Sequence, residues 1–357
     1  MALKPPDMQS VQRVLIIKMS AMGDIVHALP VAAALKEAYP HLEISWFVEA
    51  PLAPLLTGNP TLKEVISLPK YRGKDLRSFR CLQDVGRHLR AVRERRFDLT
   101  LDLQGLTKSA TVAYASGAKL RFGYHWLREI ARMVEKPIPH RPESLHIVDQ
   151  YLDVARFLGA PCAGPIFPFH IPAEDRCAVE KMLCAEGIGY DMPFTALNPA
   201  SARTNKQWGA GRYATLSDAL YRKHGLPSVL VTADTRVAAE VMAAVQYPLI
   251  SLAGRTNLKQ LAYVLQRSAV HVCGDTGSGH LAAALGRPVV SIIGPTDPER
   301  VCPYGQRANT LSRRESCGAA CDWHRCEFAH PRCLDAISVE EVTDRVSTLL
   351  PIPVESP

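Results

Sequence analysis

Each half of this 357-residue sequence alternates buried, strand-like runs with helical segments. In the first half the strand-like runs are residues 14–17, 44–48, 65–68 and 99–103. In the second half they are residues 194–197, 228–232, 269–273 and 289–292. Strands that alternate with helices form parallel sheets covered by helices on both faces. The sequence therefore predicts an α/β protein with two Rossmann-like, doubly wound domains.

Prolines and glycines crowd residues 161–172, which indicates a linker between the two halves. We expect an N-terminal domain over residues 1–168 and a C-terminal domain over residues 169–335. A last helix and tail, residues 336–357, is expected to pack back toward the N-terminal domain. Ser338 and Glu341 match a capping box at the start of that helix. Because parallel sheets bind ligands at the carboxyl ends of their strands, we expect a ligand cleft between the facing domains.

The net charge of +7 lies entirely in the first half of the sequence. Residues 1–170 contain 23 Lys and Arg and 16 Asp and Glu, whereas the remaining residues contain 19 of each. This asymmetry favours an anionic partner for the first half, and a solvated basic surface is the alternative. The sequence shows no helix-turn-helix, zinc-finger or aromatic RNA-binding pattern, so a nucleic-acid partner is not expected.

The longest apolar runs fall short of the roughly 20 residues that span a bilayer. The first residues also lack the apolar core of a signal peptide. We therefore expect a cytoplasmic protein whose ten cysteines are mostly reduced.

The segment VHVCGDTGSGHLAAALGRPVVSIIGPTDPER, residues 270–300, carries the strongest functional signal. A strand ends at Cys273, and the turn over residues 275–280 opens an alanine-rich helix. Free amides and the helix dipole at such a turn favour an anion such as a diphosphate. The alternative is an ordinary helix start with Asp275 or Thr276 as its N-cap.

The segment RVLIIKMSAMGDIVHALPVAAAL, residues 13–35, has a strand, a turn and a helix but lacks G-x-G-x-x-G. Its turn contains one glycine, Gly23, followed at once by Asp24. The missing glycines argue against a nicotinamide-dependent oxidoreductase. From the residues alone, Asp24 is either a helix cap or a carboxylate with a chemical role.

Three segments resemble the family of ADP-heptose lipopolysaccharide heptosyltransferases: KMSAMGDIVHALP, DLQGLTKSA and DTGSGHLAAALGRPVVSIIGPTDP. They occur in the family's order, and the resemblance extends from about residue 13 to residue 350. The first two segments are most similar to heptosyltransferase I, which adds the first heptose to the inner core. The third is closer to the general family form. The resemblance implies a GT-B fold, an inverting mechanism and no required metal or cofactor.

The resemblance assigns Asp24 as the general base that takes a proton from the acceptor hydroxyl. It places Lys206 at the donor diphosphate and Ser201 as a hydroxyl contact, where heptosyltransferase I members tend to have two adjacent threonines. The adenosine is expected near Asp234 and Thr256, and the diphosphate at the helix start. The donor-binding residues that we predict are Ser201, Lys206, Asp234, Thr256, Asp275, Thr276, Gly277, Ser278, Gly279 and His280.

The resemblance also explains the basic half, because Kdo-lipid A presents phosphates and carboxylates at the cytoplasmic face of the inner membrane. Lys70, Arg72 and Lys74 match a basic loop for that headgroup, and Lys108 matches the lysine of the DLQGLTKSA segment. We therefore expect a peripheral membrane protein with ADP-heptose and Kdo-lipid A as its substrates. Each cation near an anionic surface contributes about 1 kcal/mol.

Four cysteines crowd a short segment near the C-terminus together with His324 and His330. They are Cys317, Cys321, Cys326 and Cys333. A structural zinc is one interpretation, and reduced cysteines in a loop are the other, because the spacing lacks a C-x-x-C pair. Catalysis is not expected to depend on such a site.

Two other functions stay open at this point. The first is a related glycosyltransferase with another nucleotide-sugar donor or a later core acceptor, as in heptosyltransferase II. The second is a non-catalytic protein that binds a sugar nucleotide, which would bind ADP tightly without turnover.

Overall fold

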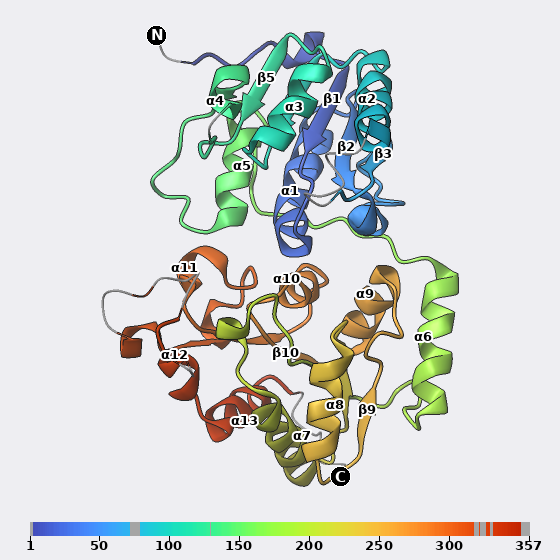
Figure 1. Cartoon of the computed structure of the whole chain (residues 1–357), viewed down its shortest axis with the longest axis vertical. Helices are drawn as coiled ribbons and strands as arrows, with labels where there is room; N and C mark the ends of the chain where they lie inside the picture. Colours follow the sequence, from blue (N-terminus) through green and yellow to red (C-terminus); the bar gives the residue numbers. More distant parts are fainter. Residues whose placement is uncertain are drawn as a thin grey trace. The chain divides into compact units, whose positions relative to one another are not determined.

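The computed structural model describes residues 3–71, 79–128, 130–317, 321, 326–328 and 331–350. The chain divides into two compact units, Met1–His170 and Ile171–Pro357. The boundary falls within the segment rich in proline and glycine. Each unit contains one six-stranded sheet whose paired strands are all parallel (Figure 1). The α/β class predicted from the alternating pattern is therefore confirmed in both halves.

The sheet of the first unit has the strand order β3-β2-β1-β4-β5-β6. Its strands are β1 (Arg13–Ile17), β2 (Glu43–Glu49), β3 (Glu64–Leu68), β4 (Leu99–Asp102), β5 (Leu120–Gly123) and β6 (Lys136–Pro137). Its α-helices are α1 (Met22–Ala38), α2 (Phe79–Glu94), α3 (Thr107–Ala115), α4 (Ala131–Val134) and α5 (Ile147–Phe157).

The central strand β1 is buried on both faces, which is why it consists of a continuous apolar run. Leu15 and Ile17 point to one face and pack with Val92 of α2 and Val112 of α3. Residues 14 and 16 alternate with them, are equally buried and point to the opposite face. There α1 packs against α5, as right-handed crossovers require.

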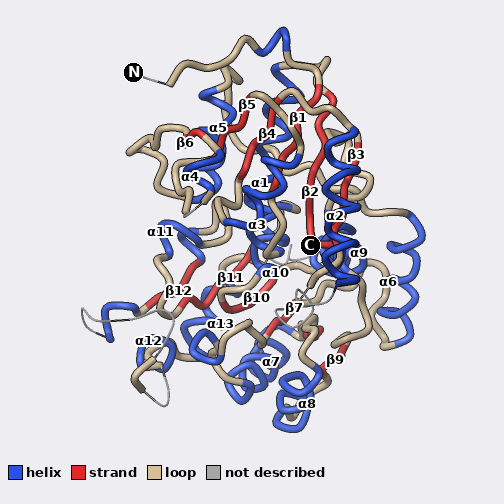
Figure 2. Tube along the Cα trace, turned by 45° about the horizontal axis from the view of Figure 1, so that its top comes forward, coloured by secondary structure: helices blue, strands red, loops and turns tan. Residues whose placement is uncertain are grey.

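The sheet of the second unit has the strand order β12-β11-β10-β7-β8-β9. Its strands are β7 (Thr195–Asn198), β8 (Ser228–Leu230), β9 (Leu249–Ser251), β10 (Val270–Gly274), β11 (Val289–Ile293) and β12 (Thr310–Ser312). Its α-helices are α6 (Ala173–Ala185), α7 (Ala210–His224), α8 (Thr235–Ala244), α9 (Leu258–Arg267), α10 (Gly277–Ala284), α11 (Pro298–Val301), α12 (Arg332–Asp335) and α13 (Val339–Ser347). Figure 2 shows the strands of each sheet among the helices.

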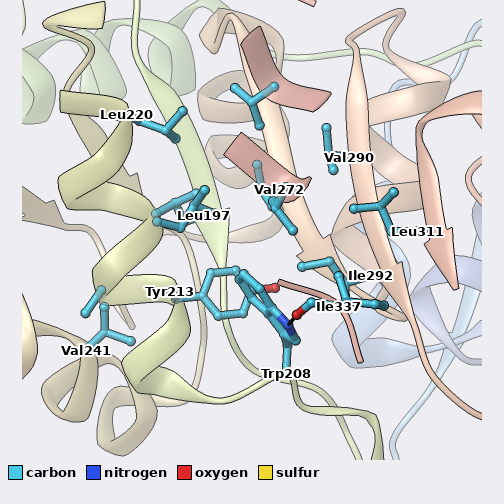
Figure 3. Close-up of a cluster of buried hydrophobic side chains, with 14 of the residues drawn as sticks. Leu197, Trp208, Tyr213, Leu220, Val241, Val272, Val290, Ile292, Leu311 and Ile337 are labelled. Carbon is cyan, nitrogen blue, oxygen red and sulfur yellow. Dashed lines mark hydrogen bonds between the residues drawn. The ribbon is translucent and has the colours of Figure 1, made fainter. Parts of the chain in front are cut away.

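The core of the second unit gathers around Trp208 (Figure 3). The Trp208 ring is buried, and its Nε1 donates a hydrogen bond to the Ile337 carbonyl at 3.0 Å. Val342 and Val346 of α13 belong to the same core. The last helix thus packs on the second unit and does not form the separate segment expected at residues 336–357. Its tail, residues 351–357, lies outside the described residues.

The eight predicted strands are present, with ends shifted by two residues at most. Ser338 caps α13 by accepting a hydrogen bond from the Glu341 amide, which is one half of the predicted capping box. The sequence analysis missed β5, β6, β9 and β12, which lie at or near the sheet edges and span two to four residues each. Such short strands show too few residues for a periodic pattern.

Among the described residues, no helix combines the length and the apolar character needed to cross a membrane. The longest helix in the described part of the chain, α1, has 17 residues.

Candidate functional site

Both sheets have the same topology. In each, the first three strands are added toward one edge and the next three toward the other edge, so the strand order reverses between two central strands. These strands are β1 and β4 in the first unit, and β7 and β10 in the second. In an open parallel sheet, the loops at the carboxyl ends of such a pair diverge and leave room for a ligand. The three motifs singled out in the sequence follow β1, β4 and β10, so each lies at a switch point.

Asp24 lies in the first turn of α1, just beyond the carboxyl end of β1. Its Oδ2 accepts a hydrogen bond from the Ala21 amide at 3.2 Å, so the carboxylate does cap its helix. The Asp24 side chain is nevertheless partly exposed. A carboxylate has about four lone-pair sites, so one amide contact leaves it able to accept a proton. Capping and general-base chemistry are therefore compatible at this position.

Gln104, just beyond β4, holds the turn that precedes α1. Its Oε1 accepts hydrogen bonds from the Met19 and Ser20 amides, at 3.1 and 3.3 Å. Asp102 in turn holds the Gln104 loop, because its Oδ1 accepts from the Gln104 and Gly105 amides at 2.7 and 2.9 Å. Gln104 of the DLQGLTKSA segment thus connects the end of β4 to the turn that carries the candidate base.

The carboxyl groups of Asp102 and Glu135 are buried next to each other. Burial raises the pKa of the Asp102 carboxyl, which also shares a hydrogen bond with Glu135. Burial and the neighbouring Asp102 raise the pKa of Glu135 to about 10. Glu135 therefore keeps its proton at neutral pH and donates it to Asp102. A neutral acid next to a carboxylate avoids two like charges in an apolar setting.

Lys70 and Lys108, two of the predicted acceptor contacts, meet at Glu49 at the end of β2. The Lys108 ammonium lies 2.8 Å from Glu49 Oε1, and that of Lys70 lies 3.8 Å from Oε2. Lys108 Nζ also lies 3.3 Å from the Ser20 hydroxyl, on the turn before Asp24. Lys108 therefore lies beside the turn that carries the candidate base, and Lys70 shares its partner Glu49. Arg72 and Lys74, the other predicted contacts, lie outside the described residues.

Lys206 of the second unit pairs with Asp275, just beyond β10. The Lys206 ammonium lies 2.5 Å from Asp275 Oδ2, and the Thr296 hydroxyl donates to the same oxygen at 2.6 Å. Burial alone would raise the pKa of Asp275, but the charge of Lys206 and these hydrogen bonds outweigh it and lower the pKa. Ser201 donates to the Asp275 carbonyl at 3.2 Å. The predicted donor residues Ser201, Lys206 and Asp275 thus converge.

The turn between β10 and α10 is held by its own hydroxyls. Thr276 is the N-cap of α10, and its Oγ1 accepts from the Ser278 amide at 3.2 Å. Ser278 is fully buried, so its hydroxyl faces the protein interior. At Gly279 a Cβ atom would lie 2.7 Å from Cys273 Sγ, so only glycine lets α10 pack this closely on β10. The predicted Gly279 therefore serves packing in this structure.

The other predicted donor residues lie at the same edge of the second sheet. Asp234 follows β8 and caps α8, because its Oδ1 accepts from the amides of residues 236 and 237, each at 3.1 Å. Thr256 lies between β9 and α9. Gly277 and His280 form the first turn of α10, and His280 lies near enough to Asp275 to help lower its pKa. A donor-binding role for these residues stays a prediction.

The sequence analysis missed four residues that organise these sites. Two are Glu49 and Thr296, described above, and two are Asn198 and His271, which both form hydrogen bonds with the Ser278 hydroxyl. Thr296 lies inside the quoted segment of residues 270–300, so its hydroxyl could have been recognised as a candidate contact. Glu49 was visible as an acid at the end of a buried strand in the basic half. His271 and Asn198 gave no signal, because each looks like an isolated polar residue in an apolar strand.

The four C-terminal cysteines lie in and beside the 3₁₀ helix Arg314–Cys317 and in α12. Burial and the neighbouring thiols, first Cys317 and then Cys321 and Cys326, raise the pKa of Cys333 to about 12. Across the described ranges, which omit His324 and His330, no group of three or more His, Cys, Asp or Glu has a metal-binding arrangement. A zinc site stays a prediction.

Comparison with known proteins identifies relatives for most of the chain. Residues 85–328 match the family model described as glycosyltransferase family 9 (heptosyltransferase). The lipopolysaccharide heptosyltransferase 1 of Salmonella typhimurium is 28% identical, over 82% of this chain and 92% of that protein. The lipopolysaccharide heptosyltransferase 2 of the same organism is 26% identical, over 84% and 87%.

A solved structure shows the same fold. The Escherichia coli heptosyltransferase WaaC with ADP superposes with a TM-score of 0.73 at 23% identity, and the match covers 95% of this chain and 100% of that one. The GT-B fold expected from the resemblance is thereby confirmed.

Proposed function

The chain belongs to glycosyltransferase family 9, the heptosyltransferase family, and from this membership we propose that it transfers heptose from ADP-heptose to Kdo-lipid A. One feature that both units share carries the proposal: charged side chains lie at each switch point. The switch point of the first sheet presents a partly exposed acid, Asp24, and the cations Lys70 and Lys108, which pair with Glu49. The switch point of the second sheet presents Lys206 beside a helix start, which suits a diphosphate.

The proposed reaction inverts the anomeric carbon in one displacement. An acceptor hydroxyl oxygen bonds to that carbon while the bond from carbon to diphosphate oxygen breaks, and ADP leaves with the electron pair. The hydroxyl proton passes to the Asp24 carboxylate. The partial exposure of Asp24 supports this role. Its helix cap is a single hydrogen bond from the Ala21 amide to Oδ2, which leaves the other carboxylate oxygen for the proton.

Lys206 and the α10 start would stabilise the charge that grows on ADP. In the structure Lys206 is paired with Asp275, which holds the ammonium at the switch point. An incoming diphosphate would share this cation, and its oxygens would face the amide end of α10. Fixed positive groups of this kind act most strongly on the transition state, where the leaving group is most negative. No step of this mechanism requires a metal ion.

Lys70 and Lys108 would bind phosphates or carboxylates of the lipid acceptor. Glu49 keeps both ammonium groups beside the turn of Asp24. The Lys70 and Lys108 side chains are 59% and 43% exposed, so an anion can reach both. Arg72 and Lys74 belong to the same proposed contact set.

A peripheral position at the cytoplasmic face of the inner membrane follows from the lipid acceptor. Exposed apolar side chains around α4 support it: Trp126 is 43%, Ile130 50% and Met133 86% exposed. Arg128 and Arg132 are exposed in the same segment, and the Arg128 guanidinium lies over the Trp126 ring. Apolar anchors interleaved with cations suit the interface of an anionic bilayer.

The decisive experiment measures ADP release from ADP-heptose, with and without deacylated Kdo-lipid A. We expect release that depends on the acceptor and persists in EDTA. Strict dependence on magnesium would contradict the proposed mechanism. The two Salmonella relatives differ by two percentage points in identity, so the acceptor must be tested directly. An inner core that already carries one heptose should be a poor acceptor, and the reverse preference would indicate a heptosyltransferase II activity.

A further inference from the structure

His271 lies beneath the proposed donor turn and takes no part in the mechanism above. It belongs to β10, and its side chain is fully buried. Its Nδ1 lies 3.0 Å from the Ala196 carbonyl of β7, and its Nε2 lies 3.0 Å from the Ser278 hydroxyl of α10. One imidazole therefore links the two strands of the switch point to the helix start.

The chemistry of these partners fixes the proton on the His271 ring. A carbonyl oxygen can only accept, so Nδ1 carries the hydrogen and donates it to Ala196. Burial lowers the pKa of His271 to about 4, so the ring is neutral at physiological pH. Its Nε2 then has a lone pair and accepts the hydroxyl proton of Ser278.

The direction of the next hydrogen bond follows from this assignment. Ser278 donates its only hydroxyl proton to His271. Its hydroxyl oxygen therefore accepts in the 2.8 Å contact with Thr276 Oγ1, and the Thr276 hydroxyl is the donor. Asn198 Nδ2 donates to Ser278 Oγ at 2.9 Å, and the Ser278 amide donates to Thr276 Oγ1. Both hydroxyl protons thus point into the protein, and N–H groups cover lone pairs of both oxygens.

We propose that His271 is a positioning residue for the donor diphosphate, acting through Ser278 and Thr276. As a neutral acceptor it sets the direction of this hydrogen-bond chain and holds the start of α10 in one conformation. The lone pairs of the two hydroxyl oxygens are then occupied within the turn and do not face an anion at the start of α10. A turn held in place before binding also loses little entropy when the ligand arrives. This inference rests on the proposed function, which places the diphosphate at α10.

Two substitutions of His271 separate an effect on donor binding from an effect on folding. Glutamine carries its amide near the Nε2 position, so His271→Gln keeps an acceptor for Ser278. Asparagine reaches only the Nδ1 position, so His271→Asn keeps the bond to Ala196 and leaves Ser278 without its acceptor. We expect His271→Asn to weaken ADP binding about tenfold and to raise KM for the donor more than it lowers kcat. His271→Gln should restore ADP affinity to near the wild-type value.

A double-mutant cycle with Ser278→Ala, which lies in α10 and outside the strand of His271, adds an independent test. Ser278→Ala removes the group through which His271 acts, so the ADP-binding defects of His271→Asn and Ser278→Ala should not add. Calorimetric titration with ADP gives the affinities, and thermal unfolding reports on the fold. Wild-type affinity in His271→Asn, equal defects in His271→Asn and His271→Gln, or strictly additive defects would overturn the inference. Wild-type protein that binds no ADP would overturn the proposed function as well.

Discussion

The Lys206 ammonium lies 2.5 Å from Oδ2 of the Asp275 carboxylate, 69 residues further along the chain. The pair joins the loop after β7 to the turn after β10, so it lies at the switch point of the second sheet. Both side chains are nearly buried, at 13% and 12% exposure. A cation held there by one carboxylate can interact with an incoming anion without a large rearrangement.

Lys206→Ala is therefore expected to weaken ADP binding by roughly 10- to 100-fold, because charge-assisted hydrogen bonds exceed neutral ones in strength. It should also lower kcat, since the charge opposite Lys206 grows in the transition state. Calorimetry and steady-state kinetics measure both effects. Lys223→Ala is the matched control, because Lys223 forms an exposed ion pair with Asp344 in the same unit. A change in acceptor KM alone would assign Lys206 to another site.

Asp24→Asn keeps the shape of the side chain but removes its ability to take a proton. We expect kcat to fall by roughly 10²–10⁴, with ADP affinity nearly unchanged. Glu37→Gln neutralises an exposed acid on the same helix and should leave kcat intact. Turnover of the Asp24 variant near the wild-type rate would show that the carboxylate only caps α1.

Lys70→Ala combined with Lys108→Ala should raise KM for the lipid acceptor about tenfold or more, at about 1 kcal/mol for each cation. Rising salt should weaken acceptor binding by the wild type more than donor binding, because these ammonium groups are exposed and the Debye length is about 8 Å at physiological salt. The double variant should lose most of that salt dependence. Arg90→Ala on the exposed side of α2 is the control. Equal salt effects on both substrates would indicate a merely solvated basic surface.

Glu135 predicts a pH dependence of stability. Its pKa is about 10 in the folded protein and near the ordinary value of 4.5 when the chain unfolds. Between these values the unfolded chain releases a proton that the folded chain keeps, so stability should fall as the pH rises. Glu135→Gln keeps a donor for Asp102 and removes this proton. Its free energy of unfolding, measured by denaturant titration at pH 6 and pH 9, should vary less than that of the wild type. Equal pH dependence in both proteins would contradict a protonated Glu135.

A structural zinc is one of the two interpretations of the C-terminal cysteines, with reduced thiols as the other, and the metal content of the protein tests it directly. Protein purified without added metal should contain about one zinc per chain by mass spectrometry, and Cys317→Ser should lower both the zinc content and the melting temperature. Cys177→Ser, an exposed thiol in α6, is the control. Zinc-free protein of unchanged stability would leave these residues as reduced thiols.

The sequence by itself determined the two α/β units and the places of their motifs. Continuous apolar runs such as β1, the spacing of α2 and the cap of α13 are local patterns, because neighbouring residues suffice to favour them. The turns of Asp24 and of Asp275 also follow directly from the strands that precede them. Short strands near the sheet edges, such as β6, and helices such as α5 were not predicted from these local patterns.

The tertiary structure alone decided which side chains share a site. Glu49 meets Lys108 from 59 residues away, and Thr296 meets Asp275 from 21 residues away. His271 reaches Ser278 and Ala196 only because β10 lies between β7 and the start of α10. The order of the strands in the sheet decides which of these side chains come into contact. Hydrogen bonds, burial and charge act over a few ångströms in space, so the residues next to each side chain in the sequence do not reveal these contacts. The proton on Glu135 and the neutral ring of His271 are consequences of that packing.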